Sequence, residues 1–110
     1  MTDHPKSPTP ATDCQDMADI RREIDRLDRA LVALLAERQT YIERAGHIKG
    51  SRDRVRDEAR IEDVVAKVLA EAEKQGLSAD VAETVWRAMV DRFIAHEFDV
   101  FDAVKRPAAE

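Results

Sequence analysis

One long amphipathic segment, residues 19–49, constrains the fold of this chain more than any other feature. Its apolar side chains recur three or four positions apart, the spacing that places them on one stripe of a helix. The stripe consists of Ile20, Ile24, Leu27, Leu31, Leu34, Leu35, Tyr41, Ile42, Ala45 and Ile48. We predict one unbroken helix that continues to about Ser51. Gly46 interrupts the good helix formers late in this segment, and a glycine there is tolerable and allows the close approach of another element.

The predicted length of this helix implies a second chain. At 1.5 Å per residue the helix is about 50 Å long, whereas a compact domain of about 100 residues has a radius of gyration of about 13 Å. A helix of that length would protrude from a monomer with its apolar stripe in water. We therefore expect it to pair lengthwise with a second copy, and we predict an all-α homodimer.

Two shorter helices follow a loop at residues 50–57. Asp57 is typical of a helix N-cap, which predicts a second helix over residues 58–75. Gly76 stops that helix, and a third helix follows over residues 79–104. The short turn between them makes the second and third helices neighbours. The arginines of the loop are expected to be solvated, with closure of the loop over an anion as the alternative.

The chain is short enough for a single domain. Residues 1–16 are rich in Pro, Thr, Ser and Asp, a composition that cannot bury enough apolar surface to order itself. We predict a disordered tail there, one helical domain over residues 17–104, and a C-terminal tail over residues 105–110. Aromatic residues make up only 5% of the chain, while Ala, Glu, Arg and Leu are abundant, and this composition favours helix throughout.

Charge and cysteine usage exclude several classes of function. The formal net charge of -5 weighs against nonspecific binding to nucleic acid or to an anionic membrane. Cys14 is the single cysteine, so an intrachain disulfide and a thiolate metal cluster are excluded. His4, His47 and His96 lack the spacing of metal ligands, and we expect no metal site. Because the N-terminus has no apolar core of a signal peptide, we expect a cytoplasmic protein.

Three cations on the first helix point to an anion site. Arg38 lies inside the apolar stripe, and Lys49 follows eleven residues later, close to three helical turns, on the same face. Arg21 precedes Arg38 by seventeen residues, which places it about 25 Å away and about 100° round the axis. If two copies of the helix pair antiparallel about Val32, Arg21 of one chain arrives beside residues 38–49 of the other. A two-fold dimer would then hold two sites, each built from both chains.

Glu97 is the acidic counterpart of Arg38, because it falls in the apolar register of the third helix. A charge on a buried stripe loses hydration on the order of several kcal/mol, so it needs a partner or a ligand. In one interpretation, Arg38 and Glu97 pair with each other inside the dimer. In the other, Arg21, Arg38 and Lys49 enclose a small polyanion, and the glutamate forms a fourth polar wall. Arginine forks and a compact lysine donor suit a dicarboxylate with one further oxygen.

The same residues resemble the all-helical chorismate mutase family, together with its isochorismate pyruvate lyase branch. The matching text is IRREIDRLDRALVALLAERQTYIERAGHIK, VRDEARIEDVV and GLSADVAETVWRAMVDRFIAHEFDVF, which covers nearly all of the chain outside its tails. The resemblance implies three helices per chain, intertwined in a homodimer with two active sites. It also implies chorismate or isochorismate as the substrate and no cofactor.

The resemblance also implies roles for individual residues. Arg21, in DIRREID, matches an arginine donated by the other protomer, and Arg38, in LLAERQ, matches the in-chain arginine that binds a substrate carboxylate. Lys49 matches a lysine that hydrogen-bonds a carboxylate and the ether oxygen of the substrate. Asp57, in VRDEAR, matches an aspartate near the substrate hydroxyl. Glu97 falls where many members of the family have glutamine and some have glutamate.

Two departures from the mutase pattern leave the reaction open between two activities. Ile61 stands where typical mutases have a glutamate, and an apolar residue there resembles the lyase. Phe93 stands where some mutases have a small hydroxyl residue. The loop text VRDEAR, with Arg60 as a supporting arginine, resembles the mutases, whereas DCQDMADIRREIDRLD resembles the lyase. We predict a chorismate mutase that forms prephenate. The alternatives are an isochorismate pyruvate lyase and a non-catalytic helical dimer or regulatory partner.

Overall fold

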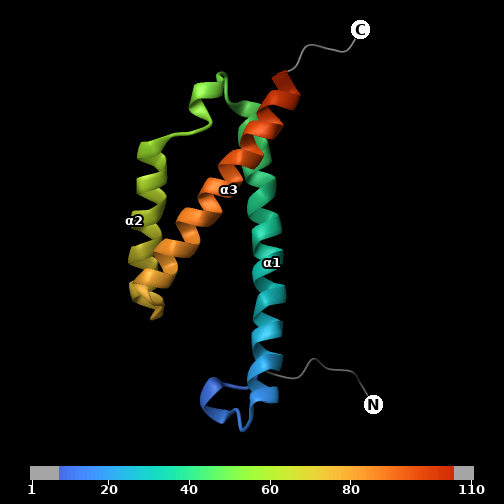
Figure 1. Ribbon diagram of the computed structural model, residues 1–110, viewed down its shortest axis with the longest axis vertical. Coiled ribbons are helices and arrows are strands. Elements are labelled where there is room, and N and C mark those ends of the chain that lie inside the picture. Colours follow the sequence, from blue (N-terminus) through green and yellow to red (C-terminus); the bar gives the residue numbers. More distant parts are fainter. Residues whose placement is uncertain (1–7, 106–110) are drawn as a thin grey trace. The chain divides into compact units, whose positions relative to one another are not determined.

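Three α-helices make up most of the computed structural model, which describes residues 8–105 (Figure 1). The helices are α1 (Met17–Ile48), α2 (Glu58–Gln75) and α3 (Ala79–Lys105), and two short 3-10 turns are η1 (Ala11–Asp13) and η2 (Arg52–Arg54). This described part of the chain contains no strand. The prediction of an all-α chain with a long first helix is confirmed.

Helix boundaries differ slightly from those predicted. α1 ends at Ile48 rather than near Ser51, and α3 continues one residue further than predicted, to Lys105. η1 lies within the segment predicted to be disordered, and residues 1–7 and 106–110 lie outside the described residues. The assignments of the two tails therefore stay predictions. None of the helices between residues 8 and 105 has the length and apolar character needed to cross a membrane.

The chain divides into two compact units, residues 1–38 and 39–110. In the first unit, two aspartates fix the start of α1. Asp16 Oδ1 accepts a hydrogen bond from the N–H of Asp19 at 2.9 Å, and Asp19 Oδ2 accepts one from the N–H of Gln15 at 2.9 Å. The bond from Gln15 is the largest cause that lowers the pKa of Asp19. These carboxylates satisfy N–H groups around the first turn of the helix.

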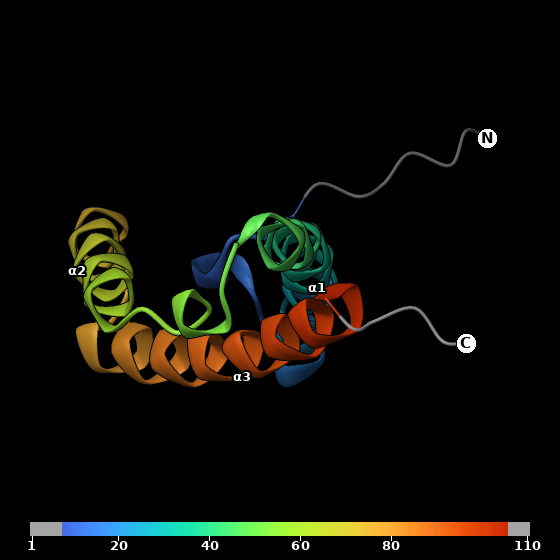
Figure 2. The same cartoon turned by 90° about the horizontal axis from the view of Figure 1, so that it is seen from above.

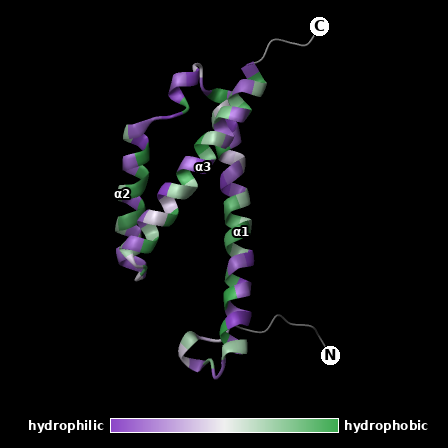
Figure 3. Cartoon of the chain, viewed as in Figure 1, coloured by the Kyte–Doolittle hydropathy of each residue, from purple (hydrophilic) through white to green (hydrophobic). Residues whose placement is uncertain are grey.

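An exposed apolar stripe runs along α1 in this first unit (Figure 3). We define the α1 stripe as Ile24, Leu27, Leu31, Leu34 and Leu35. Between 37% and 63% of the surface of each of these residues is exposed. Their spacing of three and four residues keeps them on one side of the helix. A contiguous apolar patch of this kind marks an interaction surface.

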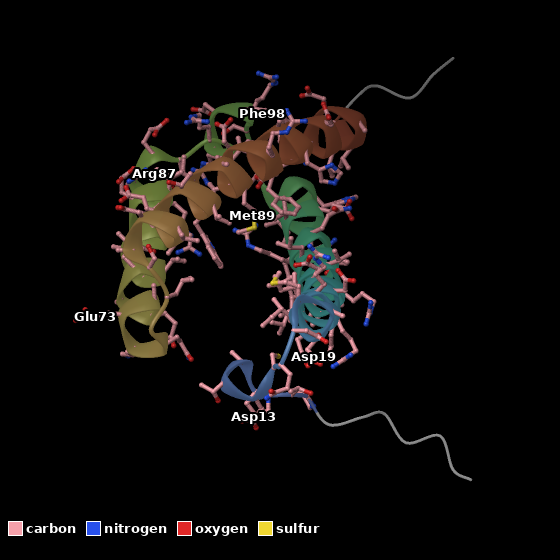
Figure 4. The ribbon with its side chains drawn as sticks, turned by 60° about the horizontal axis from the view of Figure 1, so that its bottom comes forward. Asp13, Asp19, Glu73, Arg87, Met89 and Phe98 are labelled. Atoms are coloured by element: carbon pink, nitrogen blue, oxygen red, sulfur yellow. The ribbon has the colours of Figure 1, made fainter. Side chains whose placement is uncertain are left out.

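In the second unit, α2 packs against α3 as a helical hairpin (Figure 2), and this unit holds a small apolar core. The buried apolar side chains of this unit are Val55 from the loop, Ile61, Val65 and Ala72 from α2, and Ala82, Val90 and Phe101 from α3. At the edge of the hairpin Arg87 leaves α3 toward α2 (Figure 4) and binds both carboxylate oxygens of Glu62, at 2.9 and 3.0 Å. This hydrogen-bonded pair raises the pKa of Arg87 and lowers that of Glu62.

Gly76 makes the turn between α2 and α3 possible. Its φ of 76° is left-handed, a conformation in which a side chain crowds the backbone. The N–H of Leu77 donates to the carbonyl oxygen of Ala72 at 2.9 Å, and the N–H of Gly76 donates to that of Glu73 at 3.4 Å. These bonds close the last turn of α2 as a Schellman motif does. The predicted helix stop at Gly76 is confirmed.

We expect Gly76→Ala to lower the free energy of unfolding by about 1 kcal/mol, because the left-handed backbone penalises a residue with a Cβ by about 1–2 kcal/mol. Gly50→Ala is the matched control. Nothing lies within 4 Å of a Cβ at either glycine, and only Gly76 has a positive φ. Urea unfolding of both variants at one protein concentration measures the difference. Equal losses at the two positions would contradict the backbone explanation.

Candidate active site

An ion pair between Lys49 and Glu97 joins the end of α1 to α3 within the second unit. The two side chains meet with Nζ 2.5 Å from Oε2. The Glu97 side chain is 5% exposed and that of Lys49 is 29% exposed. Among the described residues Glu97 is the one charged residue that is buried. Because a carboxylate taken out of water needs a partner, the ammonium group of Lys49 offsets the desolvation of Glu97.

The loop after α1 folds back over Lys49. The N–H of Lys49 still donates to the carbonyl oxygen of Ala45 at 3.0 Å, so its backbone continues the last turn of α1. Its Nζ also lies 3.5 Å from the carbonyl oxygen of Val55, whose side chain is buried. The apolar side chain of Val55 therefore anchors the loop while its backbone turns an acceptor toward the ammonium group.

A cleft of about 610 Å³ opens beside Lys49. Its lining consists of Lys49, Asp53, Arg54, Arg56, Asp57 and Glu58. The volume lies within the range of small-molecule sites, and the lining mixes three cations with three carboxylates. Lys49 belongs both to this cleft and to the ion pair with Glu97, so a polar ligand in the cleft reaches a charged group that is already held in place.

Asp57 caps α2, as predicted, because its Oδ1 accepts a hydrogen bond from the N–H of Arg60 at 3.0 Å. Its proximity to a substrate hydroxyl, which the resemblance implies, stays a prediction. The guanidinium of Arg60 pairs with Asp63 of the same helix at 2.5 Å, and the Arg60 side chain is 61% exposed. Ile61 is 8% exposed and contributes an apolar side chain to the core. The start of α2 therefore places no carboxylate at position 61.

Arg21 and Arg38 both lie on α1 in the first unit, whereas Lys49, Asp57 and Glu97 lie in the second. Arg21 is exposed and Arg38 is half-buried. The structure thus brings together Lys49 and Glu97, and the convergence of the two arginines on this pair stays a prediction. Neither interpretation of the sequence included a direct bond between Lys49 and Glu97. The signal for it was present, since both charges fall in an apolar helical register.

Two loop arginines that were expected to be solvated are exposed but paired with α3. Arg52 Nε lies 3.1 Å from Asp102 Oδ1, and its guanidinium carbon lies 4.5 Å from the ring centroid of Phe98, labelled in Figure 4. Arg56 Nη1 lies 3.2 Å from Asp91 Oδ1. Asp91 and Asp102 are eleven residues apart, close to three turns, so they share one face of α3. The eleven-residue spacing of the two aspartates is therefore the sequence signal for these two ion pairs between the loop and α3.

A second polar contact between α1 and α3 lies next to the ion pair. His96 Nε2 is 2.6 Å from Glu43 Oε2, and this contact is the largest cause that lowers the pKa of Glu43. His96 directly precedes Glu97, so both residues link the same turn of α3 to α1. Within residues 8–105, no three side chains of His, Cys, Asp or Glu gather in a way that could hold a metal ion.

The chain is similar to known proteins over the range that contains this site. Residues 20–98 match the family model for chorismate mutase type II. The isochorismate pyruvate lyase of Pseudomonas aeruginosa is 31% identical over 85 residues, which cover 77% of this chain and 84% of that protein. The T-protein of Haemophilus influenzae is 37% identical over 83 residues, which cover 74% of this chain and 22% of that protein. The family match includes all five predicted site residues.

Proposed function

Because the chain belongs to the chorismate mutase type II family, we propose that it converts chorismate to prephenate at a site built around Lys49 and Glu97. The observation that carries this proposal is a buried carboxylate paired with a lysine beside a polar cleft. The rearrangement is unimolecular and pericyclic, so it needs no nucleophile. The protein has to hold the enolpyruvyl chain over the ring and to stabilise the charge that develops as the C–O bond breaks.

Lys49 is the proposed donor to the ether oxygen. Negative charge grows on this oxygen in the transition state, and a donor that is already in position lowers the barrier. The Lys49 side chain lines the cleft, so a ligand there can reach the ammonium group. An ammonium group has three protons to donate. Lys49 can therefore keep its contact with Glu97 while it binds a substrate oxygen.

Glu97 is the proposed second donor, and it can act as one only when it is protonated. An ionised carboxylate accepts hydrogen bonds and donates none. The activity is therefore expected to decline as the pH rises.

Arg21 and Arg38 are the proposed clamps for the two substrate carboxylates, and they require a homodimer. The exposed α1 stripe supports this assembly, because apolar residues spaced three and four apart suit lengthwise helix pairing. Antiparallel pairing about Val32 places Arg21 of one chain opposite Glu43 of the other. Glu43 lies between Arg38 and Lys49 in the sequence, so each site would draw its cations from both chains.

An isochorismate pyruvate lyase is the second candidate, and two observations favour it. Ile61 is buried and apolar, at the position where a mutase, by resemblance, has a glutamate. The lyase of Pseudomonas aeruginosa is also similar to this chain over most of its length. Asp57 caps α2 and lines the cleft. It favours the mutase, because it belongs to the loop text VRDEAR, which resembles the mutases.

Incubation of the purified protein with chorismate and, separately, with isochorismate tests the activity. We expect prephenate from chorismate, identified by mass spectrometry. Salicylate and pyruvate from isochorismate would instead identify the lyase. Turnover of neither compound would contradict both activities and favour a non-catalytic helical dimer or regulatory partner.

Glu97→Gln should flatten the decline of kcat with rising pH, because an amide donates a hydrogen bond in every protonation state of the protein. The measurement is kcat for chorismate from acidic to basic pH. Glu71→Gln is the matched control, since Glu71 is an exposed glutamate on α2, and it should keep the wild-type profile. The proton-donor role is refuted by a Glu97→Gln variant that follows the wild-type profile.

Mixtures of Arg21→Ala and Arg38→Ala chains should recover about a quarter of the wild-type activity. Half of the randomly assembled dimers are mixed, and each mixed dimer holds one intact site if Arg21 is donated across the interface. Co-refolding followed by an assay of kcat measures this recovery. A mixture of Arg38→Ala and Lys49→Ala chains is the control, because both residues act in the same chain and neither site is repaired. Equal activity in the two mixtures would argue against a shared site.

A further inference from the structure

Gly46 lies where α1 and α3 approach each other closely within the second unit. A Cβ added to this glycine would lie 3.1 Å from Val100 Cγ1, 3.3 Å from Val100 Cβ and 3.3 Å from the carbonyl oxygen of Glu97. Contacts of that length require the neighbouring atoms to move by a few tenths of an ångström. The close approach that a glycine allows at this position is therefore present, and the approaching element is α3.

Helix formation gives no reason for a glycine at this position. Gly46 lies in the last turn of α1, and glycine is the weakest helix former apart from proline. Among the described residues Gly76 alone has a positive φ, so a left-handed backbone is not the reason either. The remaining difference between glycine and alanine is the volume of the Cβ, and that volume would overlap α3.

The contact at Gly46 lies within one helical turn of both members of the ion pair. Lys49 follows Gly46 by three residues, and its N–H is still bonded to α1. On α3, one of the contacting atoms is the carbonyl oxygen of Glu97 itself. Lys49 Nζ and Glu97 Oε2 lie 2.5 Å apart. Because less than one helical turn separates each residue from the contact, a shift of either backbone there changes this distance.

A neighbouring contact limits how the two helices respond to such a shift. Glu43 lies one turn before Gly46, and its carboxylate is 2.6 Å from the imidazole of His96. This contact holds α3 against α1 at the level of Glu97. An added methyl group at Gly46 therefore displaces the segment that carries Glu97, because the helices are tied on that flank.

We propose that Gly46 is a positioning residue: the missing Cβ sets the separation of α1 and α3 that brings Lys49 and Glu97 into contact. Only the activity test of this inference rests on the proposed function. The geometry of the ion pair is measurable without substrate, so the two proposals can fail separately.

Gly46→Ala should lower kcat for chorismate about tenfold, since displacement of catalytic groups by a fraction of an ångström slows an oriented reaction. The change in kcat should exceed the change in KM. Gly50→Ala is the matched control. It is the same substitution four residues later, with nothing within 4 Å of the added Cβ, and it should keep the wild-type kcat.

A double-mutant cycle supplies the readout that needs no substrate. Lys49→Met, Glu97→Gln and their combination are compared by urea unfolding, in the wild-type and in the Gly46→Ala backgrounds, at one protein concentration. The coupling between Lys49 and Glu97 should be lost or sharply reduced in the Gly46→Ala background. Unchanged coupling overturns the inference, even if turnover falls. Lost coupling in a protein that turns over no chorismate supports the inference while the proposed function fails.

Val100→Ala tests the steric route, because it removes Cγ1, the atom nearest to the added Cβ. Gly46→Ala combined with Val100→Ala should recover part of the coupling, and only part, since the carbonyl oxygen of Glu97 still lies 3.3 Å from the Cβ position. No recovery overturns the inference. If Gly46→Ala alone does not fold, the coupling between Lys49 and Glu97 is measured in the Gly46→Ala/Val100→Ala variant and in Val100→Ala. Equal coupling in these two variants overturns the inference.

Discussion

Glu97 is a buried carboxylate, and the structure around it depends on the counter-ion that this carboxylate needs. Desolvation of an ion costs on the order of several kcal/mol, which a counter-ion offsets only at close range and in good geometry. Lys49 meets this requirement at 2.5 Å because α1 ends beside α3 and the buried side chain of Val55 holds the loop over it. Loss of the ammonium group would leave an unpaired buried charge, so Lys49 serves folding as well as the proposed chemistry. Replacement of Glu97 by glutamine removes the charge together with the need for its partner.

The α1 stripe imposes a second constraint, which concerns assembly. Its five apolar side chains keep 37% to 63% of their surface exposed, and each square ångström of apolar surface left in water forgoes about 25 cal/mol of stabilisation. Burial of this stripe against a second copy would couple folding to association, so that stability depends on protein concentration. In the proposed homodimer the same association completes the site, because Arg21 arrives from the partner. Assembly and anion binding would then share one side of the helix, because Arg38 lies in the same register as the α1 stripe.

The sequence predicted those features that individual residues specify, and it missed those that depend on distances between helices. α2 has the predicted bounds, because Asp57 caps it and Gly76 ends it through local backbone chemistry. Lys49 and Glu97 were each recognised as charges in an apolar register, but helical periodicity gives the face of a residue and not its distance from another helix. That distance depends on the packing at Gly46. The ion pairs of the loop arginines were missed because an exposed arginine has many acidic side chains within reach.

In the proposed reaction, the protonation of Glu97 would affect both donors. With Glu97 ionised, the carboxylate holds the ammonium group of Lys49 by charge and offers no hydrogen to a ligand. With Glu97 neutral, the hold on Lys49 weakens because the attraction between opposite charges is lost, and the carboxylic acid gains a hydrogen to donate. The buried position of Glu97 keeps water from supplying competing hydrogen bonds in either state.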